Sequence, residues 1–295
     1  MRLRLSEPIE IKTPAQLALM REAGLVTAAA LRAAAAAVQP GISTAELDEI
    51  AEREIRAAGA EPSFLGYYGF PATICASVND QIIHGIPRRS QVLAAWDLIS
   101  IDCGAIVGGW HGDAALTVQV TPNQGSTAQP AAGQGRLESM VRTCEQALWA
   151  GVSQAVPGAH LTDISHAVQQ AGRTAGDFGI VREYTGHGIG SRMHMEPAVP
   201  NYGRGGRGPV LTEGMTLAIE PMLVLGTAKT RVLADGWTVV SADGSWAAHF
   251  EHTVAITADG PVVLTSADGA AATPAGGKLP MPAQAGAGPE ARHGL

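Results

Sequence analysis

The stretch DLISIDCGAIVGGWHGDAALTV, residues 97–118, is the strongest indication of the fold in the sequence. Strand-forming residues fill both flanks and glycines mark the middle, which is the pattern of two antiparallel strands joined by a tight turn. If the chain reverses between Val107 and Gly108, Asp102 and Asp113 lie directly opposite each other. Facing residues of an antiparallel pair have Cβ atoms roughly 4.5–5.5 Å apart, so the hairpin predicts two carboxylates in close contact.

Two carboxylates this close in a half-buried sheet repel each other and need a positive partner. A shared proton or a nearby basic side chain would serve, but the sequence has no Lys or Arg between Arg89 and Arg136. The hairpin alone therefore favours a metal cation over these two alternatives.

Composition limits the class of protein. The 295 residues are 46% hydrophobic and 16% charged, which is typical of a globular protein with a large core. A net charge of −7 without a block of basic residues argues against nucleic acid as the primary ligand. Three cysteines without a CxxC pair indicate a reducing, cytoplasmic location. The N-terminus lacks an apolar signal segment, and Arg32 interrupts the most apolar run, so we expect no export and no membrane span.

The chain alternates helices and strands twice. Helices are predicted over 13–38 and 43–59, the second with a capping box of Ser43 and Glu46. After the hairpin and a polar linker at 121–135, helices are predicted over 137–156 and from a capping residue, Thr162, to about Ala175. Further strands are predicted in both parts of the chain, over 73–78, 82–84, 216–224, 229–233, 237–241, 247–255 and 262–265.

Two segments suggest an internal duplication. AVQPGISTAELDEI, from Ala37, and AVPGAHLTDISHAV, from Ala155, both place Pro-Gly and a capping hydroxyl between two helices. These segments are offset by about 117 residues, and an offset of 118 carries Asp102 onto Glu220. We therefore expect halves of about 13–120 and 136–265 within one domain, 1–265, that share a central site. An Ala/Gly/Pro-rich tail, 266–295, is predicted to be disordered.

A set of acidic and imidazole side chains forms the candidate metal site. Four carboxylates and one imidazole make a mostly oxygen site that suits Mn, Fe(II), Co or Zn. Four acidic ligands exceed the charge of one divalent ion, so two metals are predicted. Each residue alone is more often structural, and the set as a whole carries the signal. The candidate ligands are Asp102, Asp113, His187, Glu220 and Glu251.

Further histidines lie in glycine- or proline-marked motifs. His84 in NDQIIHGIP and His194 in MHMEP are candidates to donate hydrogen bonds to a substrate carbonyl or amide. His111 lies nearer the turn, where a supporting hydrogen bond is favoured over metal ligation. Because strand neighbours alternate, His252 is expected to face away from the site, with His249 near its edge.

Seven motifs occur in order between about residues 12 and 265: SVNDQIIHGIP, DLISIDCGA, WHGDAALTV, TGHGIG, MHMEP, LAIEPM and HFEHTVAIT. In this series the chain resembles the type I methionine aminopeptidases. The resemblance implies an α/β (α+β) pita-bread fold with pseudo-two-fold symmetry, in which two pairs of helices flank an antiparallel sheet. It also implies a monomeric hydrolase that removes methionine from nascent polypeptides with a small second residue. Ribosome docking would then use the domain surface.

The resemblance also implies roles for individual residues. The five candidate ligands would hold two divalent metals, and a metal-bridging hydroxide would attack the methionine carbonyl. Glu220 would also shuttle the proton, while His84 and His194 would contact substrate. A methionine pocket would use aromatic and soft side chains, although Phe70 and Cys75 could equally be ordinary core. These pocket residues are Tyr67, Phe70, Cys75, Met193 and Trp237, with Phe64 at the rim. Phe64 and Met193 depart from the family pattern and are expected to change pocket shape more than reaction type.

Two other interpretations remain open at this point. Prolidases and proline-specific aminopeptidases of the same fold usually carry an Arg shortly before the last metal-binding Glu, and here Ala248, His249 and Phe250 precede Glu251. A non-catalytic binding protein on the same scaffold would have lost metal ligands, and all five candidates are present here. The sequence therefore favours the methionine aminopeptidase reading.

Overall fold

The computed structural model describes residues 8–129, 133–174 and 176–266. The predicted tail, apart from Ser266, lies outside the described residues. Within the described part no helix combines the length and the apolar character that a membrane span requires.

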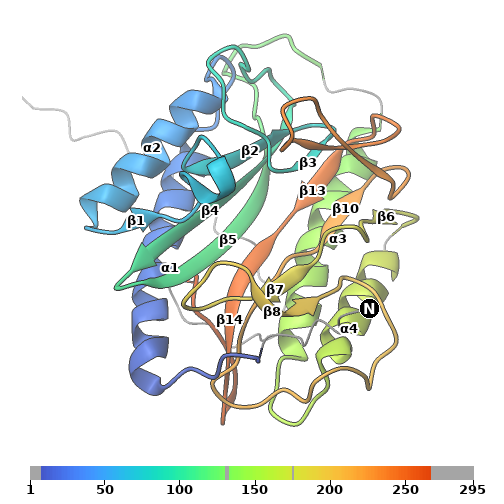
Figure 1. The fold of residues 1–295 in the computed structure, drawn as a ribbon. Coiled ribbons are helices and arrows are strands. Elements are labelled where there is room, and N and C mark those ends of the chain that lie inside the picture. Colours follow the sequence, from blue (N-terminus) through green and yellow to red (C-terminus); the bar gives the residue numbers. More distant parts are fainter. Residues whose placement is uncertain (1–7, 130–132, 175, 267–295) are drawn as a thin grey trace, which may run out of the picture.

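The described residues contain four α-helices that pack as two pairs (Figure 1). Helix α1 (Pro14–Ala36) packs on α2 (Thr44–Ala57), and α3 (Gln134–Ser153) packs on α4 (Leu161–Thr174). The predicted capping box of α2 is confirmed, since Ser43 and Glu46 each accept a hydrogen bond from the other's backbone N–H. Helix α3 begins three residues earlier than predicted, so the last two residues of the expected linker belong to it.

The prediction that Thr162 caps α4 is wrong. Helix α4 begins at Leu161, and the carboxylate of Asp163 accepts a hydrogen bond of 2.8 Å from the N–H of His160. A carboxylate suits this position because it also interacts favourably with the helix dipole. The hydroxyl of Thr162 instead donates to the C=O of Arg207 at 3.0 Å and accepts from its N–H at 2.9 Å.

One antiparallel sheet dominates the structure (Figure 1). Its strands lie in the order β1 (Glu61–Pro62), β4 (Leu98–Val107), β5 (Trp110–Gln119), β14 (Glu251–Thr257), β9 (Thr216–Ile219), β7 (Gly186–Gly188) and β8 (Met195–Val199). Strand β2 (Ile74–Val78) pairs with β4, and β15 (Gly260–Val263) pairs with β14. The sheet therefore brings β5 and β14, from distant parts of the chain, side by side at its centre.

Two small antiparallel sheets complete the described strands. One contains β13 (Ala247–His249), β10 (Met222–Val224) and β6 (Gly179–Ile180). The other contains β11 (Thr230–Val232), β12 (Val239–Ser241) and β3 (Gln81–Ile83), and a short 3-10 helix, η1, spans Tyr67–Gly69. Strands β11 and β12 are shorter than predicted, and β6 was not predicted.

The organising hairpin is present, but its predicted register is wrong. Gly108 and Gly109 form the turn with φ values of 56° and 82°, a two-residue geometry that glycine favours. The chain thus reverses between the two glycines, one position later than expected. Asp102 consequently faces Ala115, and Asp113 lies two positions away on β5. Because a shift of two positions keeps the same face, both carboxylates still point to one side of the sheet.

Two strands predicted to be continuous are interrupted. Glu220 and Pro221 separate β9 from β10, because proline has no N–H to donate to a neighbouring strand. Phe250 separates β13 from β14. The pairing keeps one register across the gap, since His252 faces Ile219 on one side and His249 faces Met222 on the other.

The helix pairs cover separate core clusters. The cluster around α1 and α2 includes Leu47 and Ile99, and the cluster around α3 and α4 includes Met140 and Ile164. Helix α1 passes so close to β5 that a Cβ on Gly112 would lie 2.6 Å from the backbone nitrogen of Gly24. This close packing holds β5 against a helix immediately beside Asp113.

Candidate active site

Sheet register places the candidate ligands on one face. Residues that face each other across an antiparallel pair point the same way, as do residues two apart on one strand. Ala115 on β5 faces Asp102 on one side and Glu251 on the other, and Asp113 lies two residues before it. His187 on β7 joins the same face through the neighbouring strand β9, and Glu220 follows the last residue of β9.

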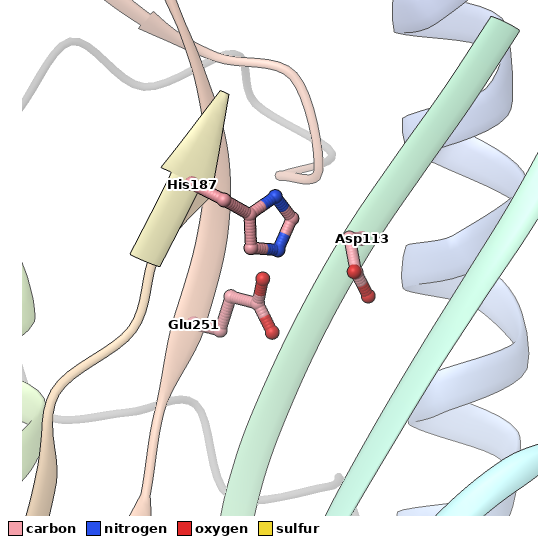
Figure 2. A group of neighbouring side chains, drawn as sticks. All are labelled: Asp113, His187 and Glu251. Carbon is pink, nitrogen blue, oxygen red and sulfur yellow. The ribbon is translucent and has the colours of Figure 1, made fainter. Parts of the chain in front are cut away.

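Three of these side chains converge on one point (Figure 2). Asp113, His187 and Glu251 each offer a ligand atom, and these atoms lie within 4.8 Å of one another. The Nδ1–H of His187 donates to the C=O of Gly188 at 3.0 Å, because a carbonyl can only accept. The neutral ring therefore presents the lone pair of Nε2, and Nε2 lies 3.5 Å from Oε1 of Glu220.

Burial makes the charged form of each carboxyl group costly. It raises the pKa of Asp113 to about 7, and it raises the pKa of Glu251 well above its ordinary value, with the neighbouring carboxylates adding to the shift. The pKa values of Asp102 and Glu220 are also raised, first by burial and then by the charge of Asp113. Burial lowers the pKa of His187 to about 3, so this imidazole is neutral. A neutral imidazole and closely spaced carboxyl groups can bind a divalent metal once the carboxyl groups lose their protons.

The donor atoms fit a divalent metal. Among the described residues, Oδ1 of Asp102, Oδ1 of Asp113 and Oε1 of Glu251 are buried without a hydrogen-bond partner. None of the described residues that line the cavity is Lys or Arg, so no basic side chain there neutralises the carboxylates. Buried, unpaired oxygens of this kind are what a hard divalent cation binds.

Two threonine hydroxyls hold the backbone beside the site. The hydroxyl of Thr253 on β14 accepts from the N–H of Asp113 at 2.9 Å and donates to its C=O at 2.8 Å. The hydroxyl of Thr117 on β5 does the same for His249, at 2.8 and 2.7 Å. At both ends of the contact between β5 and β14, a threonine hydroxyl thus takes the place of direct backbone–backbone hydrogen bonds. The sequence alone did not predict these contacts, because they depend on the exact register.

The predicted substrate histidines line the same cavity as the ligands. Nδ1 of His194 lies 2.8 Å from the hydroxyl of Tyr67, which leaves Nε2 as the nitrogen available to a ligand. The imidazole of His194 also contacts that of His187 in a tilted arrangement, with ring centroids 4.3 Å apart. His84 has a φ of 58°, a conformation that is uncommon for residues other than glycine, and its ring lies edge-on to those of Tyr184 and Trp237.

The other side of the cavity is apolar. The cavity measures about 110 Å³, well above the roughly 10–15 Å³ that one water molecule needs. Phe70 packs edge-on against Trp237, with ring centroids 5.1 Å apart, and Ile86, which the sequence did not single out, packs against the same cluster. The apolar lining consists of the predicted residues Phe64, Tyr67, Phe70, Cys75, Met193 and Trp237.

The remaining histidines near the site differ in position. Nδ1 of His111 lies 3.1 Å from the hydroxyl of Ser63, so it makes a supporting contact of the kind expected. His252 points to Thr265 and Trp149, away from the cavity. His249 was expected at the edge, but it is only 2% exposed and its Nε2 lies 3.7 Å from Oε2 of Glu220.

Comparison with known proteins shows the family to which the chain belongs. The model of "Metallopeptidase family M24" matches residues 18–258, and the chain belongs to this family. Methionine aminopeptidase 1 of Mycobacterium tuberculosis is 52% identical over 90% of this chain and 97% of its own length. Methionine aminopeptidase 1 of Bacillus subtilis is 46% identical over 86% of this chain and 98% of its own length. The resemblance to type I methionine aminopeptidases is therefore confirmed.

Solved structures show the same architecture. Methionine aminopeptidase from Thermotoga maritima superposes with a TM-score of 0.82 at 37% identity, covering 88% of this chain and all of its own. Prolidase from Pyrococcus furiosus superposes with a TM-score of 0.64 at 24% identity, covering 87% of this chain and 65% of its own. The prolidase likeness concerns the fold alone, and both comparisons confirm the pita-bread fold.

Proposed function

We propose that this protein is an aminopeptidase that removes the N-terminal methionine from polypeptide chains with the help of divalent metal ions. The observation that carries the proposal is one cavity with two unlike sides. Its polar side is lined by the five metal-ligand candidates and two histidines, and its apolar side by aromatic and sulfur-containing side chains. Family membership and the identity to proteins named methionine aminopeptidase support the same function.

Two divalent ions, of Mn, Fe(II), Co or Zn, fit the charge of the polar side. Asp102, Asp113, His187, Glu220 and Glu251 would hold them. When bound, such ions act as Lewis acids and lower the pKa of a water molecule. The carboxylates must lose their protons for this, so binding is expected to release protons.

The chain's own residues would bind the substrate and move the proton. Glu220 lies where the chain leaves β9, beside His187. It would take a proton from the attacking water and return it to the leaving amine. His194 and His84 would donate hydrogen bonds to the carbonyl and amide of the substrate as charge develops. The contact between Nδ1 of His194 and the hydroxyl of Tyr67 links His194 to the apolar side of the cavity.

The apolar side would hold the methionine side chain. A thioether packs favourably near ring edges and other soft groups, and Phe70, Trp237 and Met193 offer both. Preference for a small second residue, docking to the ribosome surface, a monomeric state and a cytoplasmic location stay predictions.

Peptide assays test the proposal. Met-Ala-Ser and Ala-Pro-Ala are incubated with the protein, with added metal and with a chelator. Release of methionine that the chelator abolishes is the expected result. Proline-directed cleavage would show a prolidase instead, and no turnover with any divalent metal would indicate a non-catalytic binding protein.

A further inference from the structure

His249 is a buried imidazole that the proposed mechanism does not use. It ends β13, it is 2% exposed, and its Nε2 has no hydrogen-bond partner among the described residues. Nε2 lies 3.7 Å from Oε2 of Glu220, while Nε2 of His187 lies 3.5 Å from Oε1. The carboxyl group of Glu220 therefore lies between two imidazoles, one on each oxygen.

A single side chain fixes the backbone of His249. The hydroxyl of Thr117 accepts from its N–H at 2.8 Å and donates to its C=O at 2.7 Å. Oγ of Ser100 lies 2.8 Å from the same hydroxyl, and all three residues are buried. With both backbone groups held, His249 has little freedom to move relative to the sheet.

Glu220 needs a partner for its carboxyl group because it lies outside the regular strands. It precedes Pro221 in the gap between β9 and β10, where its C=O accepts a hydrogen bond of 2.9 Å from the side-chain amide of Asn201 but its carboxyl group receives none of this support. A residue that receives and returns a proton must stay within hydrogen-bond reach of the reacting atoms. A contact of 3.7 Å is too long for a hydrogen bond, but catalytic contacts often shorten when the substrate complex forms.

We propose that His249 is a positioning residue for Glu220, whose Nε2–H donates to Oε2 and keeps the carboxyl group aimed at the reacting centre. The proposal rests on the proposed function of Glu220. Its alternative is that the imidazole only fills space. Leucine fills similar space without a donor, whereas glutamine carries an N–H donor, so His249→Leu and His249→Gln separate the two roles.

The experiment uses the full chain and two measurements. The first is kcat and KM for Met-Ala-Ser at saturating Mn²⁺, and the second is the affinity of the metal-free protein for Mn²⁺ by titration calorimetry. Loss of a partner that orients a ligand typically costs about 10–100-fold in metal affinity or activity. We expect His249→Leu to lower kcat by about that factor with little change in KM, and to weaken Mn²⁺ binding, while His249→Gln retains most of both.

A folded His249→Leu variant that keeps wild-type kcat and Mn²⁺ affinity would overturn the proposal, as would an equally impaired His249→Gln variant. If the wild type releases no methionine, the proposed function fails, but Mn²⁺ affinity still tests the positioning role.

Thr117 provides a second test should His249→Leu not fold. Thr117→Val removes the hydroxyl that holds His249, and Thr117→Ser keeps it. Thr44→Val is the matched control, since the buried hydroxyl of Thr44 binds the N–H and C=O of Arg88 in the same manner, away from the cavity. We expect kcat to fall in Thr117→Val and to hold in Thr117→Ser and Thr44→Val. Equal kcat in all three would contradict the proposal.

Discussion

The burial of Asp113 suits a metal ligand but lowers the stability of the metal-free protein. Its side chain is 4% exposed beside other carboxylates, and its pKa is raised to about 7. At pH 8 the metal-free protein must hold this group ionised in an environment that disfavours the charge. Residues that serve function in this way commonly reduce stability.

Asp113→Asn therefore has opposite effects on stability and activity. We expect the metal-free variant at pH 8 to melt higher than the wild type, by about 2–4 °C for each kcal/mol of relieved strain. Mn²⁺ should stabilise the variant less than the wild type, and methionine release should be abolished. Calorimetric melting with and without Mn²⁺ measures the first two effects. A variant with near-full activity would show that Asp113 is not a ligand.

The hydroxyl of Tyr67 is a second residue whose role can be isolated. It lies 2.8 Å from Nδ1 of His194, and an ordinary hydrogen bond contributes about 0.5–1.5 kcal/mol. Tyr67→Phe keeps the apolar ring and should lower kcat/KM for Met-Ala-Ser by roughly 2- to 12-fold. Tyr202→Phe, at a ring that packs on Arg182, is the control and should leave kcat/KM unchanged. An unchanged Tyr67→Phe variant would show that the contact does not orient His194.

At the scale of elements, the sequence predicted the helices and strands better than their register. Composition and glycine placement predict the hairpin, but which glycines occupy the turn depends on small differences in turn energy. An error of one position in the turn displaced the pairing by two and left the faces unchanged. The candidate ligands could therefore be placed on one face from the sequence, while contacts that depend on exact register, such as Thr253 with Asp113, could not be predicted.

The Thr253 contact gives a prediction for the β5–β14 pair. Thr253→Val keeps the shape but leaves the N–H and C=O of Asp113 without this partner, and an unsatisfied buried group costs about 1–3 kcal/mol. We expect urea unfolding to show a loss of about 2 kcal/mol or more, with weaker Mn²⁺ binding. Thr253→Ser keeps the hydroxyl and should retain the Mn²⁺ affinity. If valine and serine variants bind Mn²⁺ equally, the hydroxyl does not position Asp113.

At the scale of the whole molecule, corresponding parts of the chain carry similar contacts. Thr44 and Thr162, separated by the offset of 118 residues that relates Asp102 to Glu220, each bind the N–H and C=O of an arginine. This likeness favours the internal duplication, which stays a prediction together with the assignment of halves and tail. Side-chain packing in the cavity could be anticipated only through the family resemblance, since periodicity does not say which aromatic residues meet.

The charge of the site makes stability depend on pH. Raised carboxyl pKa values, such as that of Asp113 at about 7, contribute stability that is complete below the ordinary value of 3.8 and is lost as pH rises through the folded value. Buried histidines act in the opposite sense, because pKa values lowered from 6.5 to about 3, as for His187 and His249, contribute stability that is lost as pH falls below 6.5. The histidines of the unfolded chain have lost their protons by about pH 7.5, so above this pH the site's histidines no longer change and its carboxyl contribution still does.

Because the pKa values of Asp102, Glu220 and Glu251 are raised well above their ordinary values, we expect the metal-free protein to lose thermal stability between about pH 7.5 and 8.5. The Mn²⁺-loaded protein should change less over this range, because the metal favours the ionised carboxylates. The difference between the two melting temperatures should thus widen as pH rises. A difference that stays constant with pH would mean that these carboxylates do not bind the metal.

An anomalous difference map from crystals grown with Mn²⁺ tests the central claim most directly. The convergence of Asp113, His187 and Glu251 within 4.8 Å predicts strong density between these three side chains, with Asp102 and Glu220 adjoining it. Density at this position would show that carboxylates from separate strands share a metal centre. A map with no peak there, or with the carboxylates engaged by basic side chains instead, would contradict the account.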